Sequence, residues 1–328
     1  MSFISYAQNF EDVMLWRALN HIQSGCYIDV GAWSPDDDSV TRSFYEYGWR
    51  GVNIEPNPTM FKLLQERRNE DINLNVALSD KEQSVELYMV SDLSGLSTID
   101  KAYFKKIAMD GHDIETIECQ AITLNNVWEK AVGEKQVHFL KVDVEGAEEA
   151  VIRGNDWKKN RPWIVLVEAT YPNSPVPTYQ AWENLLLQAD YIHVYSDGLN
   201  RFYVSKEHSE LQNSFQLPPN IFDDFKLAIQ IKVETDVLNL TQQYKDLARQ
   251  YHEIKAVNSQ LQDVNSQLQD ANSQLLRADA WLKDMGEELQ FYRAGMQRII
   301  NDRFYKMLRK MGIWAWMEEI VEKLSTIK

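Results

Sequence analysis

Cysteine is scarce in this chain: its 328 residues include only Cys26 and Cys119. Two distant cysteines provide neither a disulfide framework nor the Cys-x-x-Cys spacing of a zinc site, and such low usage is typical of a reducing compartment. No run approaches about 18 apolar residues, so we expect no membrane span. Glu11 and Asp12 precede the first basic residue, Arg17, and no basic residue precedes an apolar run. We therefore expect no secretory signal and a cytoplasmic protein.

Positive charge is also in short supply. The chain has 34 basic and 49 acidic side chains, for a formal net charge of −15. Nucleic acid is excluded as the main partner, because no net basic footprint is available to neutralise phosphates. Hydrophobic residues make up 44% of the chain and charged residues 25%, which is the balance of a folded protein rather than a disordered one.

Residues 1–225 have the pattern of an α/β domain. Short apolar runs alternate with segments of helix length, which predicts βαβ units and a parallel sheet. The expected strands are Cys26–Val30, Gly51–Glu55, Asn73–Leu78, Val137–Val142 and Trp163–Glu168, and the expected helices include Ser39–Tyr47, Pro58–Arg68 and Glu148–Gly154. Tyr191–Tyr195 and Arg201–Val204 flank a turn-like segment and predict an antiparallel hairpin at the edge of the sheet.

Proline is absent after residue 226, and an apolar residue recurs at every seventh position from Val233 to Met296. This spacing predicts a coiled coil over residues 226–302, a rod on the order of 100 Å at about 1.5 Å per residue. Leu at the first core position with Val and Ala at the second favours a parallel homo-oligomer, with a trimer preferred to a dimer. The alternative is a helix folded back on the globular domain.

The last segment, residues 303–328, combines six basic and three acidic residues with many apolar ones, including Trp314 and Trp316. Basic residues beside tryptophan are typical of a helix in a lipid headgroup layer. We expect this tail to hold the protein at the inner face of the cell membrane. The alternative is an aromatic cap on the coiled coil.

Acidic residues mark the ends of the first two expected strands. Asp29 and Gly31 end the first strand, and Glu55 ends the second, 24 residues beyond Gly31. A carboxylate at that place can accept hydrogen bonds from both ribose hydroxyls of an adenosine cofactor. No glycine occurs between Gly31 and Gly48, so the Gly-x-Gly-x-x-Gly fingerprint is missing. This absence favours S-adenosylmethionine over NAD, because no loop is built to approach a pyrophosphate. Alternatively, Gly31 is only a turn and Glu55 faces solvent.

Residues 2–225 resemble the FkbM family of S-adenosylmethionine-dependent methyltransferases, in particular a branch found among bacterial surface-polysaccharide genes. The segments that carry this resemblance are Ser5–Asp12, Ile28–Ala32, Asp38–Thr41, Gly48–Pro56, Asn75–Asp80, Gly95–Thr98, His138–Glu148, Trp163–Thr170, Asp197–Tyr203 and Pro218–Asp224. The chain departs from the family pattern at Trp33 and Pro35, where most members have Asn and a second Gly. It departs again at Leu124-Asn-Asn126, where the usual residues are Leu-Asp-Asp.

The resemblance implies a Rossmann-like class I methyltransferase sheet and a set of cofactor contacts. Asp29, Gly31 and Ala32 would lie beside the methionine part of the cofactor, Glu55 and Pro56 beside its ribose, and Ser79 and Asp80 beside its adenine. Asp143, Glu145 and Glu168 would be the catalytic group, with Asp143 also touching the cofactor.

The implied reaction is O-methylation of a sugar hydroxyl on a polysaccharide or lipid-linked glycan. Methyl transfer to a hydroxyl needs alignment and a proton acceptor, and we expect Asp143 in that role. It could act alone or through a divalent metal such as Mg²⁺, which Asp143 and Glu168, with Glu145, are suited to bind. His138 and His193 fall in mid-strand and are expected to be core or edge residues. Two alternatives are a non-catalytic tether with a ligand-binding domain, and methylation of a small secondary metabolite.

Overall fold

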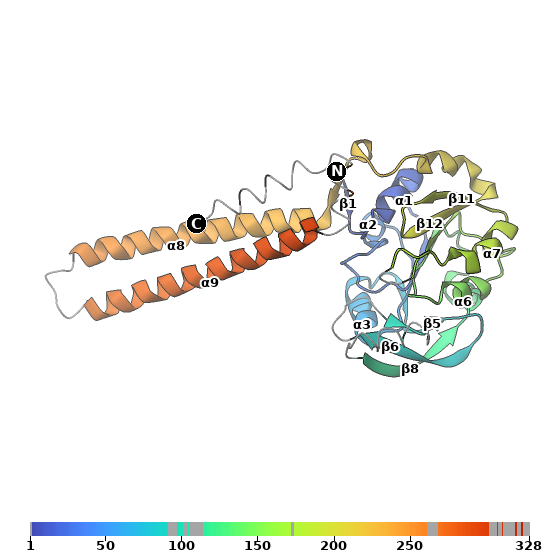
Figure 1. The fold of residues 1–328 in the computed structure, drawn as a ribbon, viewed down its shortest axis with the longest axis horizontal. Coiled ribbons are helices and arrows are strands. Elements are labelled where there is room, and N and C mark those ends of the chain that lie inside the picture. The colour runs from blue at the N-terminus through green and yellow to red at the C-terminus, as the bar shows by residue number, and fades with distance from the viewer. Residues whose placement is uncertain are drawn as a thin grey trace. The chain divides into compact units, whose positions relative to one another are not determined.

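The computed structural model divides the chain into two compact units, residues 1–225 and 226–328 (Figure 1). It describes residues 2–90, 97–100, 104, 114–171, 174–260, 268–301, 307, 310, 319 and 323. The expected tail at residues 303–328 therefore lies almost entirely outside the described residues, as do Gly95 and Leu96 of the family-like segments.

The first unit is built on a seven-stranded sheet with the order β11-β12-β10-β9-β2-β3-β4. Five neighbouring strands run parallel: β10 (Ile164–Glu168), β9 (Phe139–Val142), β2 (Tyr27–Val30), β3 (Val52–Ile54) and β4 (Ile72–Leu74). The predicted hairpin is confirmed, since β11 (Tyr191–Ser196) and β12 (Asn200–Ser205) pair antiparallel and β12 pairs antiparallel with β10. The mixed α/β architecture is consistent with a methyltransferase fold.

Short helices connect the strands of this sheet. They are α1 (Glu11–Leu19), α2 (Arg42–Glu46), α3 (Pro58–Arg67), α5 (Leu124–Val127), α6 (Glu148–Arg153) and α7 (Glu183–Gln188), with a π-helical turn at Trp128–Val132 and 3₁₀ segments at Tyr179–Ala181, Lys206–Phe215 and Ile221–Asp223. The α3 helix shows why its start is predictable: the side chain of Asn57 accepts hydrogen bonds from Thr59 and Met60, and Pro58 occupies the first helical position.

The central strands are buried on both faces, as expected for a parallel sheet covered by helices. One apolar cluster gathers around Val30, Val142 and Val167, and a second around Phe44, Trp49 and Phe139. The strand ends that carry the polar residues are therefore held by a rigid core.

A second sheet differs from the sequence prediction. The expected strand Asn73–Leu78 is divided between β4 of the large sheet and β5 (Ala77–Leu78), which belongs to a four-stranded sheet of order β5-β8-β6-β7. Its other members are β6 (Gln83–Val90), β7 (Ser97–Thr98) and β8 (Ile114–Ile122). The long strands β6 and β8 were not predicted, because polar side chains interrupt their apolar residues, so neither forms a continuous apolar run like those of the central strands.

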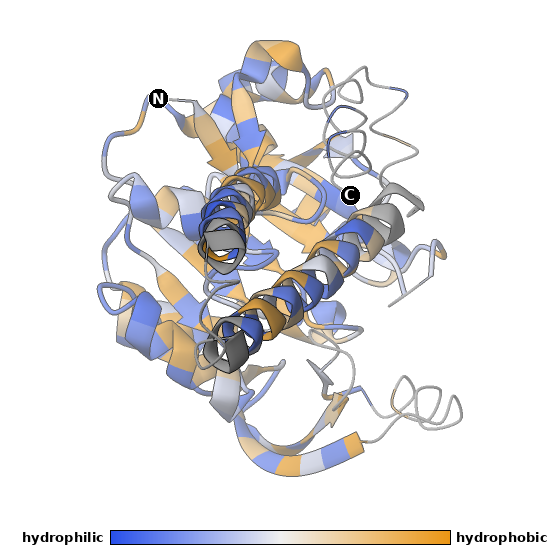
Figure 2. Cartoon of the chain, turned by 90° about the vertical axis from the view of Figure 1, so that its left-hand side faces the viewer, coloured by the Kyte–Doolittle hydropathy of each residue, from blue (hydrophilic) through white to orange (hydrophobic). Residues whose placement is uncertain are grey.

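The second unit contains two long helices, α8 (Ala228–Gln260) and α9 (Leu268–Asn301), which contact each other. Buried Met296 near the end of α9 packs with Val233 and Val237 near the start of α8, so the two helices run antiparallel. Figure 2 shows hydrophilic and hydrophobic residues alternating along both helices. The single continuous rod expected over residues 226–302 is thus not what the structure shows. The apolar seam has a partner within the same chain, and a repeat of apolar positions does not specify whether its partner is parallel or antiparallel.

A short strand, β1 (Phe3–Ser5), begins the chain, and β13 (Phe225–Leu227) lies at the division between the two units. Among the residues that the structure describes, no helix is both long enough and apolar enough to cross a membrane.

Candidate active site

The register of the parallel sheet brings the predicted acidic residues to one edge. Val30 of β2 pairs with Val142 of β9, and Val142 pairs with Val167 of β10. The residues that follow these valines are Gly31, Asp143 and Glu168. Parallel strands end at the same edge of a sheet, so the three residues line up side by side. Ligands of open α/β sheets bind at this edge.

Gly31 allows the ends of β2 and β9 to approach closely. Its φ is +75°, and a Cβ atom built on it would lie 1.8 Å from the backbone oxygen of Asp143. The backbone N–H of Asp143 in turn donates to the oxygen of Val30 at 3.1 Å. Only glycine fits a position that combines this backbone conformation with this contact.

Lys141 links the acidic residues of the two strands. Its Nζ donates to the backbone oxygen of Gly31 at 2.7 Å and lies 3.2 Å from Asp143 Oδ2 and 3.5 Å from Asp29 Oδ1. Burial alone would lower the pKa of Lys141, but the charges of Asp143 and Asp29 outweigh it and raise the pKa. Lys141 therefore stays charged and fixes the orientation of Asp143.

No role was predicted for Lys141, although its sequence position carries a signal. A lysine inside an apolar strand run needs a buried partner, because an unpaired ammonium is costly to remove from water. Thr41 was also missed: its hydroxyl donates to Asp29 Oδ2 at 2.8 Å. Asp29 is 1% exposed and is thus held on both sides.

Glu55 lies directly after β3 and is 3% exposed, so the alternative that it faces solvent is wrong. Its two oxygens accept hydrogen bonds from the backbone N–H groups of Trp33 at 2.7 Å and Asn57 at 2.8 Å. Burial raises the pKa of Glu55 to about 7, and these two bonds offset part of that effect. A carboxylate oxygen has two lone pairs, so each can accept one further donor.

The loop after β2 explains how the chain tolerates its departure from the family pattern. Trp33 adopts a φ of 50°, a left-handed conformation in which glycine is usual. The N–H of Trp33 is directed to Glu55, which compensates for part of the backbone strain. On the other side, Asn75 donates from Nδ2 to the backbone oxygens of Glu55 and Pro56, both at 2.9 Å. Asn75 is a second positioning residue that was not predicted.

The loop between β9 and α6 places two more carboxylates. Glu145 has a φ of 54° and Gly146 a φ of +104°, so the backbone turns sharply at this point. Glu148 accepts hydrogen bonds from the backbone N–H groups of Val144 and Gly146, so it stabilises the start of α6. Burial raises the pKa of Glu148 to about 7.

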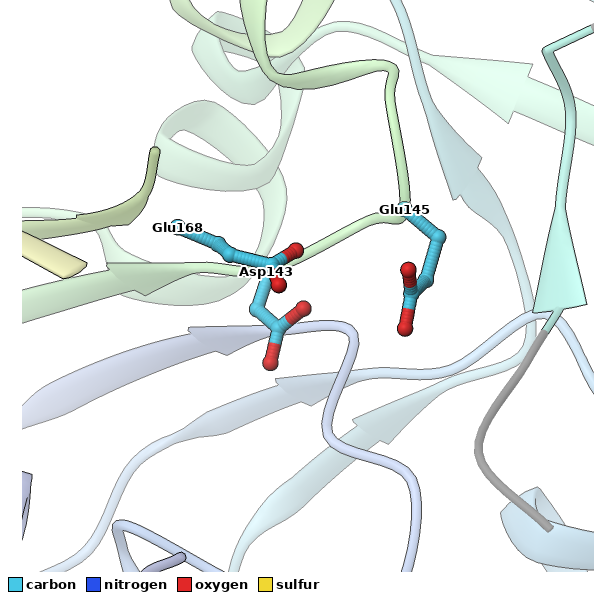
Figure 3. A group of neighbouring side chains, drawn as sticks. All are labelled: Asp143, Glu145 and Glu168. Carbon is cyan, nitrogen blue, oxygen red and sulfur yellow. The ribbon is translucent and has the colours of Figure 1, made fainter. Parts of the chain in front are cut away.

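Asp143, Glu145 and Glu168 come together in space (Figure 3). Each offers one carboxylate oxygen within 4.8 Å of the others, although Glu145 and Glu168 come from different elements. Burial, and then the charges of Asp143 and Glu148, raise the pKa of Glu145 to about 9. Burial followed by the charge of Asp143 likewise raises the pKa of Glu168. The cluster is therefore short of positive charge.

Ser79 and Asp80 occupy a different part of the surface. They line a groove of about 1100 Å³ together with Gly146 and Ala147 of the loop after β9. Asp29 and Glu55 are not among the described residues that line this groove. The loop of residues 143–147 is therefore shared between the strand-end cluster and the groove.

The two histidines have no part in this edge. His138 accepts a hydrogen bond at Nδ1 from the N–H of Cys26, and its ring packs against Trp49 and Trp163. His193 lies in β11 and packs against Tyr203. Burial lowers the pKa of both, as expected for structural histidines.

A comparison with protein families matches residues 29–192, half of the chain, to the FkbM methyltransferase domain. No curated protein matches the chain. The matched range begins at Asp29 and includes Gly31, Glu55, Asp143 and Glu168.

Proposed function

The chain belongs to the FkbM family of methyltransferases, and from this premise we propose that it transfers a methyl group from S-adenosylmethionine to a hydroxyl oxygen of a glycan. The observation that carries the proposal is the alignment of Gly31, Asp143 and Glu168 at one edge of the sheet, with buried Glu55 beside them on the next strand. This edge is where the fold class holds its ligands.

The residues at this edge suit the cofactor. Gly31 lets the ends of β2 and β9 lie close together at this edge, and Asp29 Oδ1 is buried without a hydrogen bond, although Lys141 lies nearby. Glu55 keeps a free lone pair on each oxygen for the two ribose hydroxyls. We assign Asp29, Gly31 and Ala32 to the methionine part and Glu55 and Pro56 to the ribose.

Asp143 is the proton acceptor in this proposal. When bound, S-adenosylmethionine supplies an electrophilic methyl carbon on its sulfonium. The Asp143 side chain is 38% exposed, so an acceptor hydroxyl can reach it. Lys141 Nζ lies 3.2 Å from Asp143 Oδ2, which leaves the other oxygen of Asp143 to take the hydroxyl proton. Unchanged turnover by an Asp143→Asn variant would move this role elsewhere, first of all to Glu168.

A glycan acceptor is supported by two observations. The first is the resemblance of residues 2–225 to a branch found among surface-polysaccharide genes. The second is the groove next to the loop of residues 143–147, whose lining includes Asp80, Glu86, Asp100 and Glu118. Carboxylates accept hydrogen bonds from the hydroxyl groups of a sugar, and an apolar metabolite offers no such donors.

Calorimetric titration with S-adenosylmethionine tests the cofactor site. Loss of the Glu55 carboxylate leaves two ribose hydroxyls without partners and should cost about 1.5 to 3 kcal/mol, or about 10- to 150-fold in affinity. Glu66→Ala is the matched control, because Glu66 is exposed on α3. If Glu55→Ala binds as tightly as Glu66→Ala, the site is assigned wrongly. Tight binding of S-adenosylmethionine without any methyl transfer to glycans would instead favour the alternative of a non-catalytic tether with a ligand-binding domain.

A further inference from the structure

The cluster of Asp143, Glu145 and Glu168 has the composition of a site for a hard divalent cation. Carboxylate oxygens are the ligands that Mg²⁺ and Ca²⁺ prefer. Oxygens bound to one ion lie up to about 4.2 Å apart around Mg²⁺ and about 5 Å apart around Ca²⁺, twice the respective metal–oxygen distances. In the structure, one oxygen from each of the three residues lies within 4.8 Å of the others. The spacing thus suits a divalent ion with little rearrangement.

Glu168 provides a second and independent observation. It is only 8% exposed, and its Oε2 atom is buried without a hydrogen-bond partner among the described residues. Figure 3 shows its side chain extended toward Asp143. A buried carboxyl oxygen with no donor beside it is satisfied either by a proton shared with the neighbouring carboxylate of Asp143 or by a bound cation.

The backbone prevents Glu168 from relaxing away from the cluster. It ends β10, which is paired on one side with β9 and on the other with β12, where Glu168 itself lies opposite Asn200. A central strand fixed on both sides cannot shift its last residue toward solvent without losing these pairings. The orientation of Glu168 is therefore maintained by the fold.

The neighbouring charges leave the cluster negative. Lys141 is placed at Asp143 Oδ2 and at Asp29 Oδ1, so its single charge is shared with a carboxylate outside the cluster. Glu148 lies close enough to add to the negative potential at Glu145. One ammonium cannot balance this group, whereas a dication can.

We propose that Asp143, Glu145 and Glu168 bind one divalent metal ion. The site stands on the geometry alone, whereas its role rests on the proposed function. There the ion would bind the oxygen of the acceptor hydroxyl and lower the pKa of that hydroxyl, so that its proton passes more readily to Asp143. Glu145, at the loop shared with the groove, would orient the ion toward the acceptor.

The test uses the intact chain in the absence of S-adenosylmethionine. Mn²⁺ is the probe, because electron paramagnetic resonance measures free Mn²⁺ directly. We expect one Mn²⁺ per chain, displaced by excess Mg²⁺ or Ca²⁺. Glu145→Gln and Glu168→Gln should each weaken binding by about 10-fold or more. Glu149→Gln is the matched control, because Glu149 is paired with Arg153 on α6 outside the cluster. Circular dichroism melts establish that each variant is folded.

Equal Mn²⁺ binding by the parent and a folded Glu145→Gln, Glu168→Gln double variant would overturn the proposal, as would no binding by the parent. If the parent binds no Mn²⁺, the carboxylates would instead stabilise the positive charge of the cofactor. Titration with S-adenosylmethionine in the presence of EDTA separates this failure from failure of the proposed function. Cofactor binding without metal binding would refute only the metal site.

Discussion

Replacing Gly31 with alanine would place a methyl group where the structure has a backbone oxygen. The new Cβ would lie 1.8 Å from the oxygen of Asp143, so the ends of β2 and β9 would have to separate by more than 1 Å to reach about 3 Å. Neither strand can do this easily, because β9 is paired on both sides. The variant should lose both stability and the alignment of the site.

The magnitude can be worked from two contributions. A left-handed backbone costs a residue with a Cβ about 1 to 2 kcal/mol, and overpacking a tight core costs about 1 to 3 kcal/mol more. Gly31→Ala should therefore lower the free energy of unfolding by about 2 to 5 kcal/mol. This is a large part of the roughly 5 to 15 kcal/mol that is typical of a folded domain.

Urea denaturation followed by circular dichroism measures this difference. Gly48→Ala is the matched control, since Gly48, at the end of α2, also has a positive φ of 89° but no atom within 4 Å of the position that a Cβ would take. It should lose only the backbone contribution, about 1 to 2 kcal/mol. If the two variants lose equal stability, the close contact between Gly31 and Asp143 is refuted.

Three further predictions concern charge and assembly. Lys141→Met leaves buried Asp29 and partly exposed Asp143 without their cation and should cost about 3 to 5 kcal/mol of stability in urea denaturation. Lys158→Met, on the surface, should cost almost nothing, and equal losses would contradict the role of Lys141. Burial raises the pKa of Glu55 to about 7 from its ordinary value of 4.5, so the unfolded chain releases this proton first and stability falls as pH rises between these values. The thermal midpoint of the cofactor-free parent should thus fall more steeply over this window than that of Glu55→Gln, and parallel curves would count against a buried carboxyl. In flotation with anionic liposomes, the full chain should float and a chain ending at Asn301 should not. Equal flotation of the two would contradict membrane binding by residues 303–328 and favour the alternative of an aromatic cap on the helices.

The sequence was sufficient to predict the central sheet and its functional edge. The strands β2, β3, β9 and β10 are short, mostly apolar runs because both faces are buried. Carboxylates directly follow β3 and β9, and Glu168 is the last residue of β10. Asp29 and Glu55 became candidates through this pattern, whereas Asp143 became one through the resemblance to the FkbM family. Lys141 and Asn75 were identified by neither, because their roles depend on contacts between strands that are distant in sequence.

The second sheet and the helical unit show two limits of sequence patterns. Only Ala121 of β8 is buried, so this strand lacks the continuous apolar run that marks the strands of the central sheet. In the helical unit, buried Leu240, Ala278, Met285 and Met296 lie at positions predicted for the apolar seam. Their spacing identified the packed face of the helices. It did not specify that the partner helix is antiparallel and belongs to the same chain.

Methyl transfer itself is the most direct test of the central claim, that Asp143 at the sheet edge supports O-methylation of a glycan. The measurement is mass spectrometry of a lipid-linked glycan incubated with the intact chain and S-adenosylmethionine that carries an isotopically labelled methyl group. The parent should add the labelled methyl to a sugar hydroxyl, and Asp143→Asn should not, because an amide does not accept the hydroxyl proton. Undiminished labelling by Asp143→Asn, or no labelled glycan with the parent protein, would contradict the account.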